Sequence, residues 1–117
     1  DLAQAFVMKP TVMEGLLPPI GEEPQEGKIV IALEQPDGTY NYTSNASPGF
    51  WCHIDGSLGG WSEGGVYCEF PGGLTVAYGH RPDMPLEAGT KAVMKPTLIY
   101  TKDGKQYKAT IVINMQV

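Results

Sequence analysis

The chain has 117 residues with 42% hydrophobic content, which is the size of one domain and enough for one modest core. Its 8 basic and 13 acidic residues give a net charge of −5, which disfavours nucleic acid or an anionic membrane as a partner. No stretch approaches the roughly 20 apolar residues that a membrane-spanning helix needs, so we expect no integral membrane segment.

Residues 1–20 differ in pattern from the rest of the chain. Asp1 is suited to cap a short helix over residues 2–8, and Thr11 and Glu14 form a capping-box pattern at the start of a second helix. We therefore expect residues 1–20 to form a helical preface that packs on the remainder of the domain.

From residue 28 the hydrophobic pattern changes to the two-residue period of β-strands. Residues 28–34 form an apolar run rich in Ile and Val, and residues 35–38 (QPDG) are typical of a turn. The following segment, residues 39–43, carries Tyr40 and Tyr42 on one face. Together these segments predict a β-hairpin.

Further strands are predicted toward the end of the sequence. Residues 74–78 form a short strand with Leu74, Val76 and Tyr78 facing inward, and residues 79–90 form an irregular loop. Residues 97–101 and 105–117 flank an Asp-Gly turn and predict a second hairpin. The odd positions of its last strand are apolar, which indicates one buried face: Tyr107, Ala109, Ile111, Ile113, Met115 and Val117.

Short strands separated by Asp-Gly, Gly-Gly and Pro-rich turns are typical of antiparallel all-β domains. We therefore expect a single, mainly β domain. It would consist of an antiparallel β-sandwich over residues 28–117, preceded by the short N-terminal helical segment.

The stretch 49–70 holds both tryptophans, both cysteines and one of the two histidines. If its two ends are strands, alternation sorts their side chains onto two faces. The apolar face receives Phe50, Cys52, Ile54, Val66, Cys68 and Phe70. The opposite face receives Trp51, His53, Tyr67 and Glu69.

An antiparallel register that pairs Phe50 with Phe70 would also pair Cys52 with Cys68, and would place Trp51 near Glu69. His53 would then lie near Tyr67 on the same face as Trp51. Two states of the cysteines stay open at this point. Cys52 and Cys68 either form a disulfide or remain two buried thiols.

The sequence predicts neither a metal site nor a catalytic site. His53 and His80 are the only histidines, and no His-x-x-x-His or Cys-x-x-Cys spacing occurs. Asp55, Ser57 and Glu63 carry oxygen atoms suited to calcium, but their spacing matches no EF-hand loop, and a solvated surface loop is the favoured interpretation. We expect no metal, no cofactor and no catalytic residue.

The aromatic residues gather in the middle of the chain, between positions 40 and 78. An exposed Trp or Tyr offers a flat apolar plate with a polar edge, suited to a sugar ring or a protein partner. The leading hypothesis is a non-catalytic module that binds carbohydrate. Its ligand-binding residues would be Trp51, Trp61, Tyr67 and Tyr42, helped by His53, Asp55 and Glu69.

Two other functions compete with carbohydrate binding. In one, the same aromatic residues bury against another protein domain, and the chain is a structural or docking part of a larger surface protein. In the other, the chain is a small glycan-active hydrolase. The expected partner is therefore a glycan or another protein domain, and not nucleic acid.

Several short motifs between residues 36 and 70 occur in a fixed order. They are Asp37-Gly38, Asn45, Pro48-Gly49-Phe50-Trp51, Asp55, Trp61 and Tyr67-Cys68-Glu69-Phe70. In this order the chain resembles an uncharacterised β-sandwich domain of secreted proteins and lipoproteins from Bacteroidetes-type gut bacteria. It departs from that pattern at residues 45–48 and 60–63. The resemblance implies a secreted or cell-surface location, with the periplasm as an alternative, and attachment to glycan-handling proteins, but no activity.

Overall fold

The computed structural model describes residues 3–10, 23–42, 49–63, 65–72, 75–81, 83 and 86–117. Within these residues there are nine strands and one short 3₁₀ turn but no α-helix, and no helix there could cross a membrane. The elements are β1 (Ala3–Pro10), β2 (Ile29–Glu34), β3 (Tyr40–Asn41), β4 (Gly49–Cys52), η1 (Trp61–Glu63), β5 (Val66–Gly72), β6 (Thr75–His80), β7 (Lys91–Met94), β8 (Pro96–Lys102) and β9 (Lys105–Gln116).

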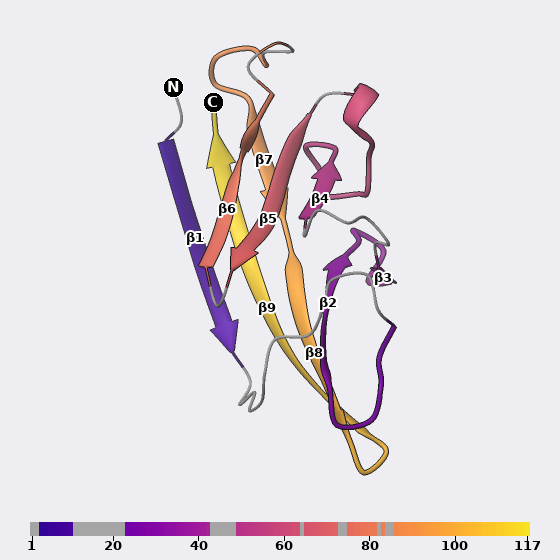
Figure 1. The fold of residues 1–117 in the computed structure, drawn as a ribbon. Helices are drawn as coiled ribbons and strands as arrows, with labels where there is room; N and C mark the ends of the chain where they lie inside the picture. Colours follow the sequence, from indigo (N-terminus) through magenta and orange to yellow (C-terminus); the bar gives the residue numbers. More distant parts are fainter. Residues whose placement is uncertain are drawn as a thin grey trace.

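The strands form two antiparallel sheets (Figure 1). The larger sheet has the order β1-β9-β8-β2-β3, and β7 continues the line of β8 along β9. The smaller sheet has the order β4-β5-β6. Because β1 pairs with residues of β9 that also pair with β7 and β8, β9 has partners on both of its edges.

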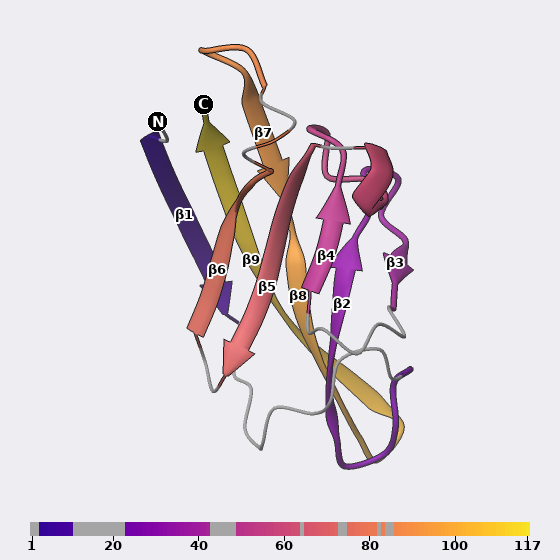
Figure 2. The same ribbon diagram turned by 45° about the horizontal axis from the view of Figure 1, so that its top comes forward.

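The two sheets lie face to face in two layers, as Figure 2 shows, and share one core. The smaller sheet contributes the buried residues Phe50, Cys52, Val66, Cys68 and Phe70. The larger sheet contributes Ile31, Leu33, Ala92, Met94, Ile111, Ile113 and Met115. The predicted class, mainly β and antiparallel, is confirmed, and the shared core between two sheets fits the expected sandwich.

A second, smaller cluster lies on the opposite face of the larger sheet. Val30, Ala32 and Ile99 are buried there, with Tyr40 and Tyr42 packed against them. This explains the continuous apolar run of β2, because its side chains are buried on both faces of the sheet.

The helix predicted over residues 2–8 is wrong, because the chain forms strand β1 there. Ala3 to Pro10 pair along their whole length with the segment from Ala109 to Gln116 of β9. A local capping pattern is worth about 1 kcal/mol, and a complete ladder with a distant strand outweighs it. The second predicted helix, from Thr11 onward, lies outside the described residues.

Both predicted hairpins are confirmed. β2 and β3 pair across the turn at residues 35–39. β8 and β9 pair across Asp103-Gly104, whose φ angles of 52° and 74° are those of a type I′ turn. In β9 the buried face is confirmed from Ala109 to Met115. Tyr107 is the exception, with 41% of its surface exposed, because this hairpin extends beyond the smaller sheet (Figure 1).

The predicted register of β4 and β5 is wrong by two residues, although both faces are as predicted. Phe50 pairs with Cys68, Trp51 with Tyr67, and Cys52 with Val66. A shift of two residues leaves every side chain on the same face of the sheet. Ile54, however, lies beyond β4 in a turn and is 45% exposed instead of buried.

Cys52 and Cys68 are both free and fully buried. Since Cys52 pairs with Val66 and Cys68 with Phe50, the two cysteines are diagonal neighbours and not a directly opposite pair. Hydrogen bonding to the Cys52 thiol, together with burial, raises the pKa of the Cys68 thiol. The structure therefore favours two thiols over a disulfide.

We predict that both cysteines remain reduced in the native protein. The intact mass should be the same with and without reductant, and a thiol reagent should label neither residue until the protein is unfolded. A mass lower by two hydrogens before reduction would contradict this expectation.

Candidate functional site

The outward-facing side of the smaller sheet carries three of the seven residues that the sequence analysis selected. Since Val66, Cys68 and Phe70 fill the core, Tyr67 and Glu69 of β5 must face outward. The register places Trp51 and Gly79 on either side of Tyr67, and Gly49 and Ala77 on either side of Glu69. We call this surface, formed by Trp51, Tyr67, Glu69, Ala77 and Gly79, the aromatic face.

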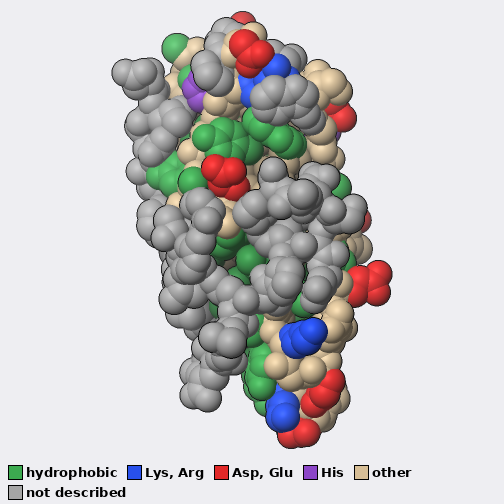
Figure 3. All heavy atoms as spheres, viewed as in Figure 1, with side chains coloured by type: hydrophobic (Ala, Val, Ile, Leu, Met, Phe, Trp, Pro, Cys, Tyr) green, Lys and Arg blue, Asp and Glu red, His purple; other side chains and the backbone are tan. Residues whose placement is uncertain are grey.

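Figure 3 shows hydrophobic side chains on this side of the molecule, with acidic side chains beside them. The rings of Trp51 and Tyr67 are in contact, with centroids 5.2 Å apart and planes tilted by 57°. Both residues are half-buried. Such tilted aromatic pairs contribute roughly 0.5–1.5 kcal/mol beyond their buried area, so each ring holds the other in place.

The Tyr67 ring lies against the backbone of Gly79 on the neighbouring strand β6. A Cβ atom at Gly79 would lie 2.9 Å from the Tyr67 hydroxyl oxygen and 3.1 Å from the ring carbons Cε2 and Cζ. These distances are shorter than real contacts of this kind. Only glycine therefore allows the phenol ring to lie directly against the backbone of the neighbouring strand.

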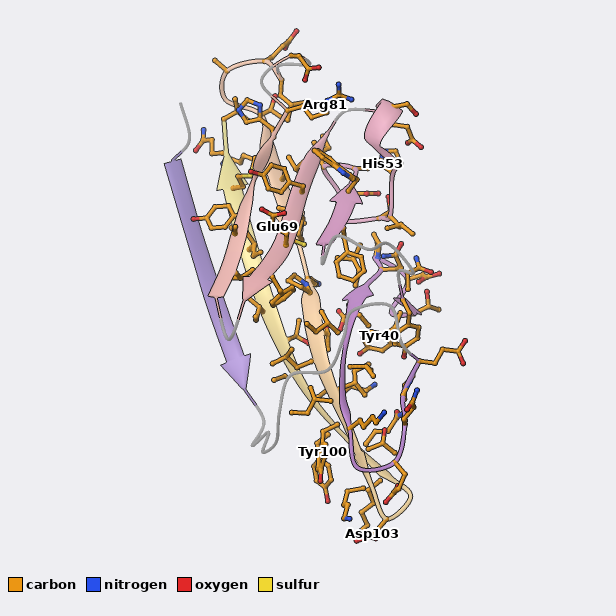
Figure 4. The ribbon with its side chains drawn as sticks, in the orientation of Figure 1. Tyr40, His53, Glu69, Arg81, Tyr100 and Asp103 are labelled. Atoms are coloured by element: carbon orange, nitrogen blue, oxygen red, sulfur yellow. The ribbon has the colours of Figure 1, made fainter. Side chains whose placement is uncertain are left out.

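His53 and Glu63 form a polar pair. Figure 4 shows His53 at the end of β4 that leads toward η1. Nε2 of His53 lies 2.9 Å from Oε2 of Glu63, and both side chains are about half exposed. The imidazole passes over Gly59, where an added Cβ would lie 3.4 Å from Nε2. This pair offers hydrogen-bonding groups on a surface that is otherwise aromatic.

The turn that follows His53 is held against the larger sheet at three points. The backbone N–H of Val93 donates to Ile54, and the backbone N–H of Leu58 donates to the side-chain oxygen of Gln35, at 3.0 and 2.9 Å. Gly56 adopts a φ of 92° and leaves space for the Val93 carbonyl oxygen, which would lie 2.7 Å from a Cβ. The position of His53 is therefore fixed by the fold.

Asp55 stabilises the same turn. Its Oδ1 accepts hydrogen bonds from the Ser57 backbone N–H and hydroxyl, at 2.9 and 2.6 Å. These two hydrogen bonds lower the pKa of the Asp55 carboxyl from its ordinary value of 3.8. No group of three or more His, Cys, Asp or Glu side chains among the described residues could hold a metal ion.

The structure brings together only some of the predicted site residues. Trp51 and Tyr67 are direct neighbours, whereas Glu69 pairs with Gly49 and not with Trp51. Tyr42 packs in the second hydrophobic cluster, on the far face of the larger sheet. The backbone of Trp61 begins η1, but its side chain lies outside the described part of the structure.

Gly79 and Glu63 were missed as site residues by sequence reasoning. A glycine within a strand pattern is the signal that could have marked Gly79. Residues 60–64 (GWSEG) also match the letters of the Gly-x-Ser-x-Gly nucleophile elbow. Ser62, however, lies in a 3₁₀ turn before strand β5, and not on the strand-to-helix turn that this motif requires.

A second aromatic pair was missed at the β8–β9 hairpin. Tyr100 and Tyr107 are directly opposite each other, with ring centroids 6.2 Å apart. They are equally spaced on either side of Asp103-Gly104, so the turn signal alone could have identified the pair.

The fold and the site define a two-sheet, mainly β domain with an aromatic outer face on its smaller sheet. The profile of the family described as a domain of unknown function, DUF4859, matches residues 1–113, and the chain belongs to this family. No curated protein and no solved structure matches the chain.

We predict that Gly79→Ala displaces the Tyr67 ring with little loss of stability, because the tyrosine side chain is half exposed and can move. The Trp51 indole N–H resonance in a ¹⁵N spectrum, assigned with Trp51→Phe, should shift. The free energy of unfolding should change by less than about 1 kcal/mol.

Gly49→Ala is the matched control on β4. Its Cβ would lie 2.9 Å from the Cys68 carbonyl oxygen, which belongs to the backbone and cannot move away easily. We expect this substitution to cost about 1–3 kcal/mol. An unchanged Trp51 resonance in Gly79→Ala would show that Tyr67 does not depend on this glycine.

Proposed function

We propose that the chain is a non-catalytic module that binds carbohydrate through the aromatic face. The contact between Trp51 and Tyr67 is the observation that carries this proposal. Aromatic rings stack on the apolar faces of sugar rings, and a ring fixed before binding loses little conformational entropy. Gly79 contributes to this arrangement, since it leaves room for the phenol ring to lie against the sheet.

Polar groups around the two rings would bind the sugar hydroxyls. Glu69 lies next to Tyr67 along β5, and the His53–Glu63 pair lies beyond Trp51 on a turn that the larger sheet holds in place. Both oxygen atoms and nitrogen atoms are thus available as hydrogen-bond partners. Asp55 shapes this turn and is assigned a supporting role, while the packing of Tyr42 on the far face argues against its part in binding.

The charges near the aromatic face favour an uncharged glycan. Glu63 and Glu69 contribute carboxylates from the described residues around it. Arg81 follows Gly79 and forms a two-point ion pair with Asp83, at 3.0 and 2.6 Å, with only 10% of its side chain exposed. Its charge is therefore neutralised locally, and an acidic sugar would meet net repulsion.

We further propose that the chain works outside the cytoplasm, at the cell surface or in a secreted protein. The resemblance of residues 36–70 to a domain of secreted proteins and lipoproteins supports this location. A surface module that holds glycans near other glycan-handling domains would suit that setting.

The expected result on affinity gels is retention of the wild-type chain by at least one neutral polysaccharide. Trp51→Ala and Tyr67→Ala should each weaken binding at least tenfold, which corresponds to about 1.4 kcal/mol. Tyr42→Ala is the matched control, because it removes an aromatic ring from the far face of the larger sheet, outside the aromatic face. If the wild-type chain is retained by no glycan, carbohydrate binding is excluded.

A docking domain within a larger surface protein is the second candidate, and two exposed apolar side chains favour it. Ile54 and Leu58 are 45% and 40% exposed in the turn beside the aromatic face. If this turn is an interface, sedimentation should show association with a partner domain or a second copy, and Ile54→Ser should abolish it.

The small hydrolase is the third candidate, with His53–Glu63 as its acid–base pair. Release of reducing ends from glycans would identify it.

A further inference from the structure

We propose a second binding site, for anionic polysaccharide, on the end of the β8–β9 hairpin. It consists of Tyr100, Lys102, Lys105 and Tyr107, and we call it the hairpin site. This site does not depend on the aromatic face, because its residues belong to the larger sheet and to the part of the hairpin that extends beyond the smaller one (Figure 1).

The register of the hairpin places all four side chains on one face. Tyr100 is directly opposite Tyr107, and Lys102 is directly opposite Lys105. The two pairs are two residues apart along each strand, so alternation turns them to the same side. The tyrosine rings are 6.2 Å apart with planes tilted by only 32°, and Tyr107 is 41% exposed. Both lysines are exposed as well.

The lysine pair is unfavourable in the absence of an anion. Like charges directly opposite each other on neighbouring strands are destabilising. Neither Lys102 nor Lys105 forms an ion pair with any described residue. The carboxylate of Glu26 lies at the same turn, where it accepts a hydrogen bond from the Asp103 backbone N–H at 2.7 Å, and it forms no ion pair with either lysine. An anion between the two ammonium groups would remove their repulsion.

The hairpin end is less acidic than the chain as a whole. Lys102 and Lys105 belong to the hairpin site, Glu26 and Asp103 lie at the turn between them, and Lys108 lies over the Tyr40 ring on the other face of the sheet. The net charge of the chain is −5. Figure 3 shows basic and acidic side chains together at this end of the molecule. The ammonium groups of Lys102 and Lys105, which form no ion pair with a described residue, are the groups that would attract an anion.

The tyrosine pair indicates that the anion is carried by a sugar polymer. The two adjacent rings, tilted by 32° to each other, offer apolar faces for pyranose rings, and the lysines next to them can pair with carboxylate or sulfate groups of the same chain. An acidic peptide offers charge but no sugar ring for this surface. The ligand class is therefore an acidic polysaccharide, whose charge comes from uronate or sulfate.

The test is affinity electrophoresis at low salt in gels that contain polygalacturonate or dextran sulfate, with methyl-esterified pectin and dextran as uncharged counterparts. We expect the wild-type chain to be retained by at least one acidic polymer, and the two acidic gels distinguish carboxylate from sulfate. The double variant Lys102→Gln/Lys105→Gln should lose retention at least tenfold. Tyr107→Ala should weaken it several-fold at unchanged charge.

Matched controls separate this site from general electrostatic attraction and from the aromatic face. Lys91→Gln removes one positive charge, as each of the two hairpin substitutions does, from an exposed position near the far end of β9, and it should leave retention unchanged. Trp51→Ala should also leave it unchanged. Equal retention by polyglutamate or single-stranded DNA would overturn the assignment to polysaccharide, and retention that survives the double lysine variant would overturn the site itself. Because the proposed neutral-glycan binding uses other residues and other gels, either proposal can fail alone.

Discussion

The alternation of side chains along β5 is the constraint on which the candidate site depends. The core between the two sheets contains Val66, Cys68 and Phe70 of this strand. Because side chains alternate along a strand, Tyr67 and Glu69 must face outward. The aromatic face is therefore coupled to the core. A change that displaced β5 by one residue would bury the aromatic ring and expose the thiol in the same step.

Much of the fold could be predicted from local patterns in the sequence. The two Asp-Gly turns identified their hairpins, and the apolar odd positions from Ala109 to Met115 identified the buried face of β9. The register of β4 and β5 failed because apolar matching cannot distinguish shifts of two residues. Strand β1 failed because its structure depends on pairing with β9, which no local signal reveals.

The candidate site was also predictable only in part. Alternation placed Trp51 and Tyr67 on one face correctly, since it needs only the order of residues within each strand. It could not place Tyr42, which belongs to the other sheet, because the packing of two sheets is not contained in the pattern of either. The role of Gly79 could not be predicted for a related reason: it comes from a side chain on the neighbouring strand, and the sequence offers only a glycine near a strand as a signal.

The two proposed surfaces lie on different sheets and would bind different classes of glycan. The smaller sheet presents aromatic rings among carboxylates, and the hairpin of the larger sheet presents aromatic rings among lysines. A polymer with both neutral and acidic segments could engage both surfaces at once. Two weak contacts on one chain raise the effective concentration at each site and give avidity that neither site has alone.

The central position of β9 also determines the order in which the protein can fold during synthesis. The strands of the smaller sheet, β4, β5 and β6, are neighbours in sequence and can pair as soon as they leave the ribosome. β1 is made first but its partner β9 is made last among the strands, so β1 must wait with an unpaired edge through most of translation. That long wait identifies β1 as the segment most exposed to aggregation and to binding by chaperones in the nascent chain.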